Sequence, residues 1–69
     1  MNDHFVIANG EKIATESPST IEQFLRARKL LPRCVVVEHN GQAVAPSEFS
    51  ERQLADGDRL EIVSVVAGG

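Results

Sequence analysis

Two Asn-Gly dipeptides constrain the fold of this chain more than any other feature of its sequence. Asn9-Gly10 and Asn40-Gly41 each lie between two runs of residues that favour β-strands. A two-residue type I′ turn needs positive φ at both central positions, and asparagine followed by glycine meets that need. We therefore expect a hairpin at each dipeptide. The predicted strands cover residues 5–8 and 11–15 in the first hairpin, and 34–39 and 42–44 in the second.

One helix is predicted between the two hairpins. Ser19 and Glu22 have the spacing of a capping box, in which two side chains bond free backbone amides of the first turn. Pro32 cannot continue a helix, so we expect the helix to end near residues 30–31. The apolar positions that follow the cap at helical spacing are Ile21, Phe24 and Leu25.

The last strand is predicted to follow the turn Asp56-Gly57-Asp58 and to run from Arg59 through Ala67. The two aspartates are expected to bond turn amides. Because the helix crossover leaves the first hairpin accessible to the last strand, we expect the first and last strands to pair in parallel at the centre of the sheet, and their strongly apolar character fits that position. The fold class is thus α+β, a mixed sheet of four to five strands with one helix packed across one face. Its predicted core comprises Phe5, Ile7, Ile13, Ile21, Phe24, Leu25, Val35, Val37, Leu60 and Ile62.

Alternation along the strands predicts that three valines point away from this core. Leu60 and Ile62 would face inward, and Val36, Val63 and Val65 would face outward. If the helix covers only one face, the three valines form an exposed apolar patch near the end of the chain. We interpret the patch as a partner-binding surface, although single exposed valines are also ordinary in strands.

Composition argues against several classes of function. The 69 residues include seven Lys and Arg against ten Asp and Glu, for a net charge of −3, which argues against nucleic-acid binding. No apolar run has the length of a membrane span. Cys34 is the only cysteine, so no internal disulfide can form and a cytoplasmic location is expected. We interpret Cys34 as a small core residue. His4 and His39 lack ligands at suitable spacing, so no metal site is expected.

The sequence finishes with Ala67-Gly68-Gly69, which we interpret as a flexible reactive tail on a single domain covering residues 1–69. Glycine has no Cβ, so a Gly-Gly pair fits a slot that is too narrow for other residues. The α-carboxylate of Gly69 is ionised at neutral pH and is the most distinctive chemical group of the chain. A frayed terminus without a function is the alternative.

A resemblance to one known family covers nearly the whole chain, and it is carried by four groups of residues between positions 35 and 69. They are Val35-Val36-Val37-Glu38 before Asn40-Gly41, Pro46 after Val44, Leu54 with Asp56-Gly57-Asp58, and the ending Val66-Ala67-Gly68-Gly69. Together they resemble the ThiS family, the sulfur carriers of thiamine biosynthesis, which have a ubiquitin-like β-grasp fold. His39 departs from the family pattern, which more often has an apolar residue at that position.

The resemblance implies that the chain is a sulfur carrier and not an enzyme. An E1-like adenylating enzyme (ThiF-like) would use ATP to convert the Gly69 carboxylate into an acyl-adenylate. A sulfur donor supplied by a cysteine desulfurase would then replace AMP and leave a thiocarboxylate. Thiazole synthase (ThiG-like) would take that sulfur for the thiazole ring of thiamine. The chain itself would bind no cofactor, and Val36, Val63 and Val65 would contact the adenylating enzyme, as the similar face does in ubiquitin-like proteins.

Three other functions are compatible with the same residues. A sulfur carrier for molybdopterin synthesis ends similarly but is usually longer. A ubiquitin-like modifier would be joined to target lysines through Gly69, and a plain β-grasp interaction domain would have an inert tail. A thiocarboxylate on the purified chain would separate a carrier from an inert domain, and a lysine-linked adduct in cells would indicate a modifier.

Overall fold

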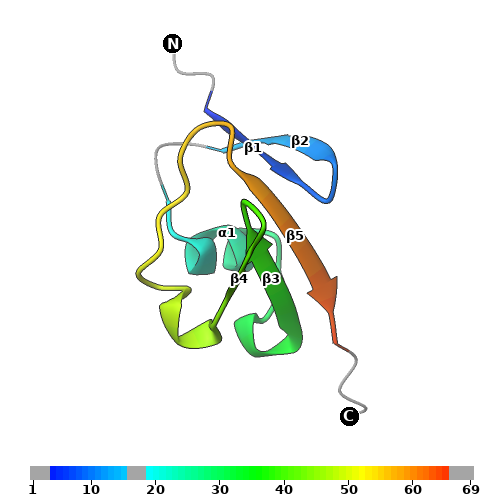
Figure 1. Ribbon diagram of the computed structural model, residues 1–69, viewed down its shortest axis with the longest axis vertical. Helices are drawn as coiled ribbons and strands as arrows, with labels where there is room; N and C mark the ends of the chain where they lie inside the picture. Colours follow the sequence, from blue (N-terminus) through cyan, green and yellow to red (C-terminus); the bar gives the residue numbers. More distant parts are fainter. Residues whose placement is uncertain (1–3, 16–18, 66–69) are drawn as a thin grey trace.

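A computed structural model describes residues 4–15 and 19–65, in which one helix lies across one face of a mixed sheet (Figure 1). The elements are β1 (Phe5–Ala8), β2 (Glu11–Ala14), α1 (Ile21–Ala27), β3 (Val35–His39), β4 (Gln42–Val44) and β5 (Arg59–Ser64), with 3₁₀ helices at Pro32–Cys34 and Pro46–Glu48. The sheet has five strands in the order β2-β1-β5-β3-β4. The predicted α+β class is confirmed.

Both predicted Asn-Gly turns are present. Asn9 and Gly10 have φ values of 52° and 82°, and Asn40 and Gly41 have values of 52° and 86°. These angles belong to the left-handed region that a type I′ turn requires at both central residues. The antiparallel pairs β1–β2 and β3–β4 follow directly from these turns.

The last strand occupies the centre of the sheet, as predicted. β5 pairs in parallel with β1 and antiparallel with β3. The side chain of Asn9 prolongs the β1–β5 contact beyond the end of β1. Its Oδ1 accepts a hydrogen bond from the backbone amide of Ile62 at 2.7 Å, and its Nδ2 donates one to the Ile62 carbonyl at 3.0 Å. The Asn9 side chain therefore makes the two hydrogen bonds to β5 that the backbone of one further β1 residue would make.

Both ends of α1 differ from the sequence prediction. Thr20, and not Ser19, is the N-cap, and its capping box is completed by Gln23 instead of Glu22. The Ser19 carbonyl accepts the Leu54 amide at 2.8 Å, which fixes Ser19 outside the helix.

The helix ends at Ala27, earlier than the predicted residues 30–31. Lys29 takes a φ of 63°, and its amide bonds the Arg26 carbonyl while the Leu30 amide bonds the Leu25 carbonyl. These two bonds form a Schellman motif, so the backbone closes the helix before the proline is reached.

The core lies between α1 and the inner face of the sheet. Six of its predicted members are buried, namely Ile21, Phe24, Leu25, Val35, Val37 and Leu60. Ile13 and Ile62 are partly buried against this cluster. Val44, Phe49 and Leu54 are also buried and were not predicted.

The predicted face of β1 is wrong by one residue. Val6 and Ala8 are the buried residues of this strand, whereas Phe5 and Ile7 are only partly buried. The register explains the difference, because Ala8 lies opposite Leu60 of β5 and shares its inward direction. On the other face, the Lys12 ammonium lies 4.4 Å from the centre of the Phe5 ring.

Candidate functional site

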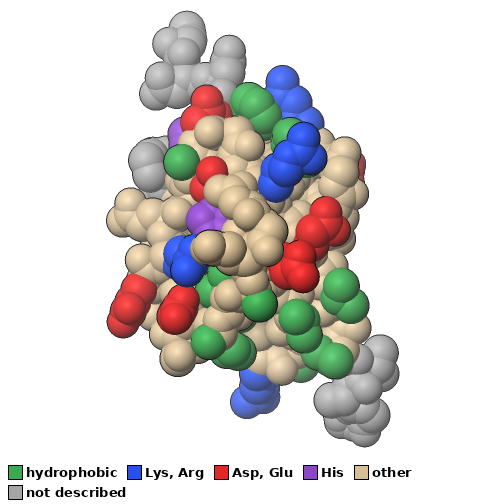
Figure 2. Space-filling model, viewed as in Figure 1, with side chains coloured by type: hydrophobic (Ala, Val, Ile, Leu, Met, Phe, Trp, Pro, Cys, Tyr) green, Lys and Arg blue, Asp and Glu red, His purple; other side chains and the backbone are tan. Residues whose placement is uncertain are grey.

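The candidate partner surface is the uncovered face of the sheet along β3 and β5. Val36 and Val63 are direct cross-strand neighbours, and their exposed fractions are 53% and 62%. Val65 follows the end of β5 and is 46% exposed. We call these three residues the valine patch. Their predicted outward positions are confirmed, and hydrophobic side chains gather visibly on this face in Figure 2.

Val65, the last residue that the structure describes, is held beside the start of β3. The Val65 amide bonds the Cys34 carbonyl at 2.8 Å, so the chain is still attached to the edge of β3 at this residue. The strand itself ends at Ser64 and not at Ala67, because Ser64 lies opposite Val35, the first residue of β3. Ala67, Gly68 and Gly69 lie outside the described residues, so their assignment to a reactive tail stays a prediction.

Cys34 and Leu31 precede β3 in positions that the sequence did not predict. Cys34 is the last residue of a 3₁₀ helix and is a partly buried free thiol outside the core cluster. Its interpretation as a core residue is therefore wrong, because β3 begins one residue later. Leu31 was expected at the end of the helix but lies in a loop, where it is 54% exposed.

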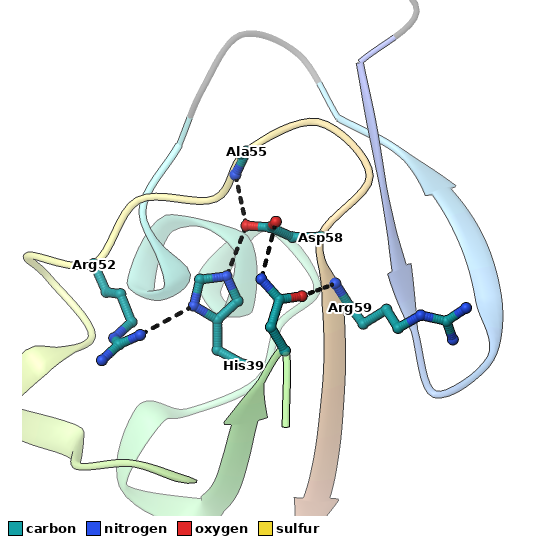
Figure 3. A network of polar contacts seen from close by, with 6 residues as sticks. His39, Arg52, Ala55, Asp58 and Arg59 are labelled. Atoms are coloured by element: carbon teal, nitrogen blue, oxygen red, sulfur yellow. Dashed lines mark hydrogen bonds and ion pairs between the residues drawn. The ribbon is translucent and has the colours of Figure 1, made fainter. Parts of the chain in front are cut away.

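A buried histidine network, missed by sequence analysis, fixes the loop before β5 (Figure 3). His39 is 7% exposed, and its Nε2 lies 2.7 Å from Oδ2 of Asp58. The same oxygen accepts a hydrogen bond from the Ala55 amide at 2.8 Å, and Oδ1 accepts one from Nδ2 of Asn40 at 3.1 Å. Nη1 of Arg52 lies 3.4 Å from Nδ1 of His39. The network joins the end of β3 to the chain that leads into β5.

Hydrogen-bond chemistry assigns the tautomer of His39. The Arg52 guanidinium has only donors, so Nδ1 must accept and the Nε2–H donates to Asp58. Partial burial raises the pKa of Asp58, but the hydrogen bonds from the Ala55 amide, His39 and Asn40 outweigh it and hold that pKa below its usual 3.8. One signal was available in the sequence, since the alternation that buries Val35 and Val37 also turns His39 inward.

The other acid of the turn also binds the backbone. Oδ1 of Asp56 accepts a hydrogen bond from the Phe5 amide at 2.8 Å. Asp56 was predicted to bond an amide of the turn, but its partner is the amide of the first residue of β1. Asp58 does bond an amide of its own turn, that of Ala55. Each aspartate thus holds a different part of the sheet to the loop.

Residues 4–15 and 19–65 contain neither a metal-binding cluster nor a membrane-spanning helix. No three His, Cys, Asp or Glu side chains in these ranges lie close enough together to hold a metal ion. None of the helices in these ranges has the length and apolar character that crossing a membrane requires.

The model of the ThiS family matches residues 2–69 of this chain. The chain belongs to the ThiS family. The sulfur carrier protein ThiS of Bacillus subtilis (strain 168) is 32% identical over 62 residues, which cover 88% of this chain and 94% of that protein. The predicted family is thereby confirmed. The match to the family model extends over all the elements described above.

A solved ThiS-family structure has the same fold. The crystal structure of the thiamine biosynthesis protein ThiS from Geobacter metallireducens superposes with a TM-score of 0.79 at 25% identity, and the match covers 94% of this chain and 99% of that one. The predicted β-grasp arrangement is confirmed by this similarity.

A longer protein contains a segment similar to this ThiS-family chain. A thiazole synthase of Paramagnetospirillum magneticum (strain ATCC 700264 / AMB-1) is 34% identical over 64 residues. The match covers 93% of this chain but only 20% of that protein. This chain therefore spans about a fifth of the thiazole synthase that it matches.

Proposed function

We propose that the α-carboxylate of Gly69 is the group through which this ThiS-family sulfur carrier takes up and donates sulfur. The observation that carries the proposal is the family match, which extends through Gly69. The structure supports it, because the central strand of the sheet leads to this residue and is bonded on both sides. A carrier needs a firmly held base and a narrow end, and Gly68-Gly69 supplies the narrow end.

The chemistry requires two steps at the carboxyl group of Gly69, the first at its oxygen and the second at its carbon. The Gly69 carboxylate attacks the α-phosphorus of ATP, pyrophosphate leaves, and an acyl-adenylate forms. A sulfur nucleophile, either sulfide or the terminal sulfur of a persulfide, then attacks the acyl carbon and expels AMP. Where the donor is a persulfide, a thiol must cleave the remaining S–S bond. The product is a thiocarboxylate, and no side chain of the carrier has to move a proton.

The partners follow from this chemistry. An E1-like adenylating enzyme (ThiF-like) would supply ATP activation, and a cysteine desulfurase would supply the sulfur. The thiocarboxylate would pass its sulfur to a thiazole synthase (ThiG-like) for thiamine. The similarity to one segment of a thiazole synthase supports this last partner, because there a related segment shares one chain with further sequence. We place these reactions in the cytoplasm, where a lone cysteine such as Cys34 stays reduced.

The valine patch is the surface that we assign to the adenylating enzyme. It lies across β3 and β5, the last strand before Gly69 in the sequence, and Val65 is separated from Gly69 by only three residues of sequence. Docking through Val36 and Val63 would therefore bring the end of the chain close to the bound nucleotide. The chain itself performs no catalysis in this scheme.

Intact mass measurement tests the proposal. Incubation with ATP, the adenylating enzyme and a sulfur source should raise the mass by the difference between sulfur and oxygen, and fragmentation should place the change at Gly69. An alanine added after Gly69 should abolish the change, and so should deletion of Gly69. Cys34→Ser should still accept sulfur. Sulfur at Cys34, or reaction of the extended chain, would contradict the proposal, and a lysine-linked adduct would indicate a protein modifier instead.

A further inference from the structure

The imidazole ring of His39 lies between a carboxylate and a guanidinium at the end of β3 (Figure 3). Its Nε2 lies 2.7 Å from Oδ2 of Asp58, and Nη1 of Arg52 lies 3.4 Å from its Nδ1. The side chain of His39 is only 9% exposed, so these two partners supply the contacts of its nitrogens. The ring is neutral in this arrangement, because Arg52 can donate only to a nitrogen that carries a free lone pair.

A proton added to Nδ1 of His39 breaks one of these contacts and keeps the other. Nδ1 becomes a donor that faces a guanidinium with only donors, and both groups then carry positive charge. The contact with Asp58 becomes stronger in the same step, because its donor is now charged. The pKa of Asp58 lies below its usual 3.8, so this carboxylate is already ionised when the histidine is protonated. Protonation of His39 therefore acts on Arg52 alone.

The side chain of Arg52 has a second partner and room to move. It is 34% exposed, and its Nη2 lies 3.5 Å from Oε1 of Glu48. It can therefore leave His39 toward Glu48 and solvent without becoming a buried, unpaired charge. Among the described residues, Asp58 and Arg52 are the charged groups that contact the ring of His39. Glu48 is connected to the ring only through Arg52.

The backbone of Arg52 joins the loop of residues 45–58 to the helix. Its carbonyl accepts a hydrogen bond from the amide of Ile21, the first residue of α1, at 3.0 Å. Phe49 and Leu54, on either side of Arg52 in the sequence, are each 1% exposed and anchor the loop in the core. Arg52 thus lies in the middle of a loop whose two flanks are fixed, and its side chain connects that middle to β3.

We propose that His39 is a pH-sensitive latch for this loop. Neutral His39 accepts a hydrogen bond from Arg52 and holds the middle of the loop against the end of β3. Protonated His39 keeps Asp58 and releases Arg52. Phe49 and Leu54 stay in the core, so the change is a local release and not an unfolding of the domain. It involves neither Gly69 nor a partner protein, and it is therefore independent of the proposed function.

Nuclear magnetic resonance on the isotope-labelled full chain tests the latch between about pH 8 and pH 5, the range in which histidine is the side chain that ordinarily changes charge. At the upper pH, long-range proton–nitrogen spectra should show a proton on Nε2 of His39 and none on Nδ1. On acidification the Nε–H group of Arg52 should lose order, with an order parameter that falls below about 0.6. The amide of Ile21 should shift with the same midpoint as the ring of His39.

His39→Gln is the matched variant that cannot gain a proton. Its amide oxygen can accept from Arg52 and its amide nitrogen can donate to Asp58, so Arg52 should be equally ordered at both pH values. His4→Gln removes the other histidine of the chain and should release Arg52 as the parent does.

The parent spectra alone can overturn the proposal. Arg52 that stays ordered after the ring of His39 has gained its proton would do so, and so would a proton on Nδ1 at the upper pH. A release that persists in His39→Gln, or disappears in His4→Gln, would show that another group is the sensor.

Discussion

The two faces of the β3–β5 pair carry the same kinds of residue in opposite surroundings. On the inner face Val37 and Leu60 are both 0% exposed beneath α1. On the outer face Val36 and Val63 are 53% and 62% exposed, although Val36 is adjacent in sequence to Val37 and Val63 lies close to Leu60 on the same strand. Hydrophobic character therefore does not distinguish a core residue from a partner contact in this sheet. The position of the single helix makes that distinction, so changes on the two faces should damage different properties.

The largest loss of stability is expected from the inner face. Leu25 of α1 is 0% exposed, and Leu25→Ala should lower the free energy of unfolding by about 2–5 kcal/mol, because it removes buried methyl groups and leaves a cavity. So small a domain has little stability in reserve. Urea denaturation measures the loss. Val63→Ala on the outer face is the matched control and should change stability by less than about 0.5 kcal/mol. Equal effects of the two variants would remove the distinction between the faces.

A smaller loss is expected from the histidine network at the end of β3. His39→Ala should cost about 1–3 kcal/mol, because it leaves Asp58 and Arg52 without a buried partner. His4→Ala is the control, since His4 makes one side-chain hydrogen bond, to Thr15 at 2.6 Å, in a less buried position. Its cost should stay below about 1.5 kcal/mol. Denaturation curves that rank His4→Ala as the more damaging change would refute the role of the network.

The pH dependence of stability should report the same network. The pKa of Asp58 lies below its usual 3.8 in the folded protein, so the folded state favours the ionised form. Its stabilising contribution is present above the unfolded value of 3.8 and is lost as pH falls through the lower folded value. Melting temperatures of the parent should therefore fall as pH drops below 3.8, and Asp58→Asn should flatten that part of the profile. A parallel decline in both proteins would show that other carboxylates dominate.

The sequence predicted the faces of β3 and β5 but not that of β1, and the reason is physical. At the start of β5 charged and apolar residues alternate, so the sequence itself indicates which side of the strand is buried. The run Phe5-Val6-Ile7-Ala8 is apolar throughout and carries no alternation of its own. Only its register with β5, which sets Ala8 opposite Leu60, determines which side faces α1. Register between distant strands is a tertiary property that a local pattern does not contain.

The helix start shows a second limit of the same kind. Ser19 with Glu22 and Thr20 with Gln23 both have capping-box spacing, so the local pattern permits two starts. The bond between the Ser19 carbonyl and the Leu54 amide selects the second. As for the candidate site, the outward valines could be predicted from alternation. The network around His39 depends on a loop whose path the sequence did not reveal.

The smallest effect on stability, and a large effect on binding, is expected from charge placed on the outer face. Val63→Asp should leave the free energy of unfolding within about 1 kcal/mol of the parent, because the side chain is 62% exposed. Its affinity for the adenylating enzyme should fall at least about tenfold, because a charge would enter an apolar contact. Val36→Asp should match it, since Val36 lies directly opposite.

Comparison with a lysine at the same position sharpens this prediction. Both charges are equally out of place in an apolar contact, so the valine patch alone predicts similar losses for Val63→Asp and Val63→Lys. Val63→Lys should therefore bind about as weakly as Val63→Asp, and a large difference between the two affinities would show that charge, and not apolar contact, dominates at this position. Calorimetry at low salt gives the order of the two affinities. Early melting of Val63→Asp or parent-like binding would show that the outer face is either part of the core or idle.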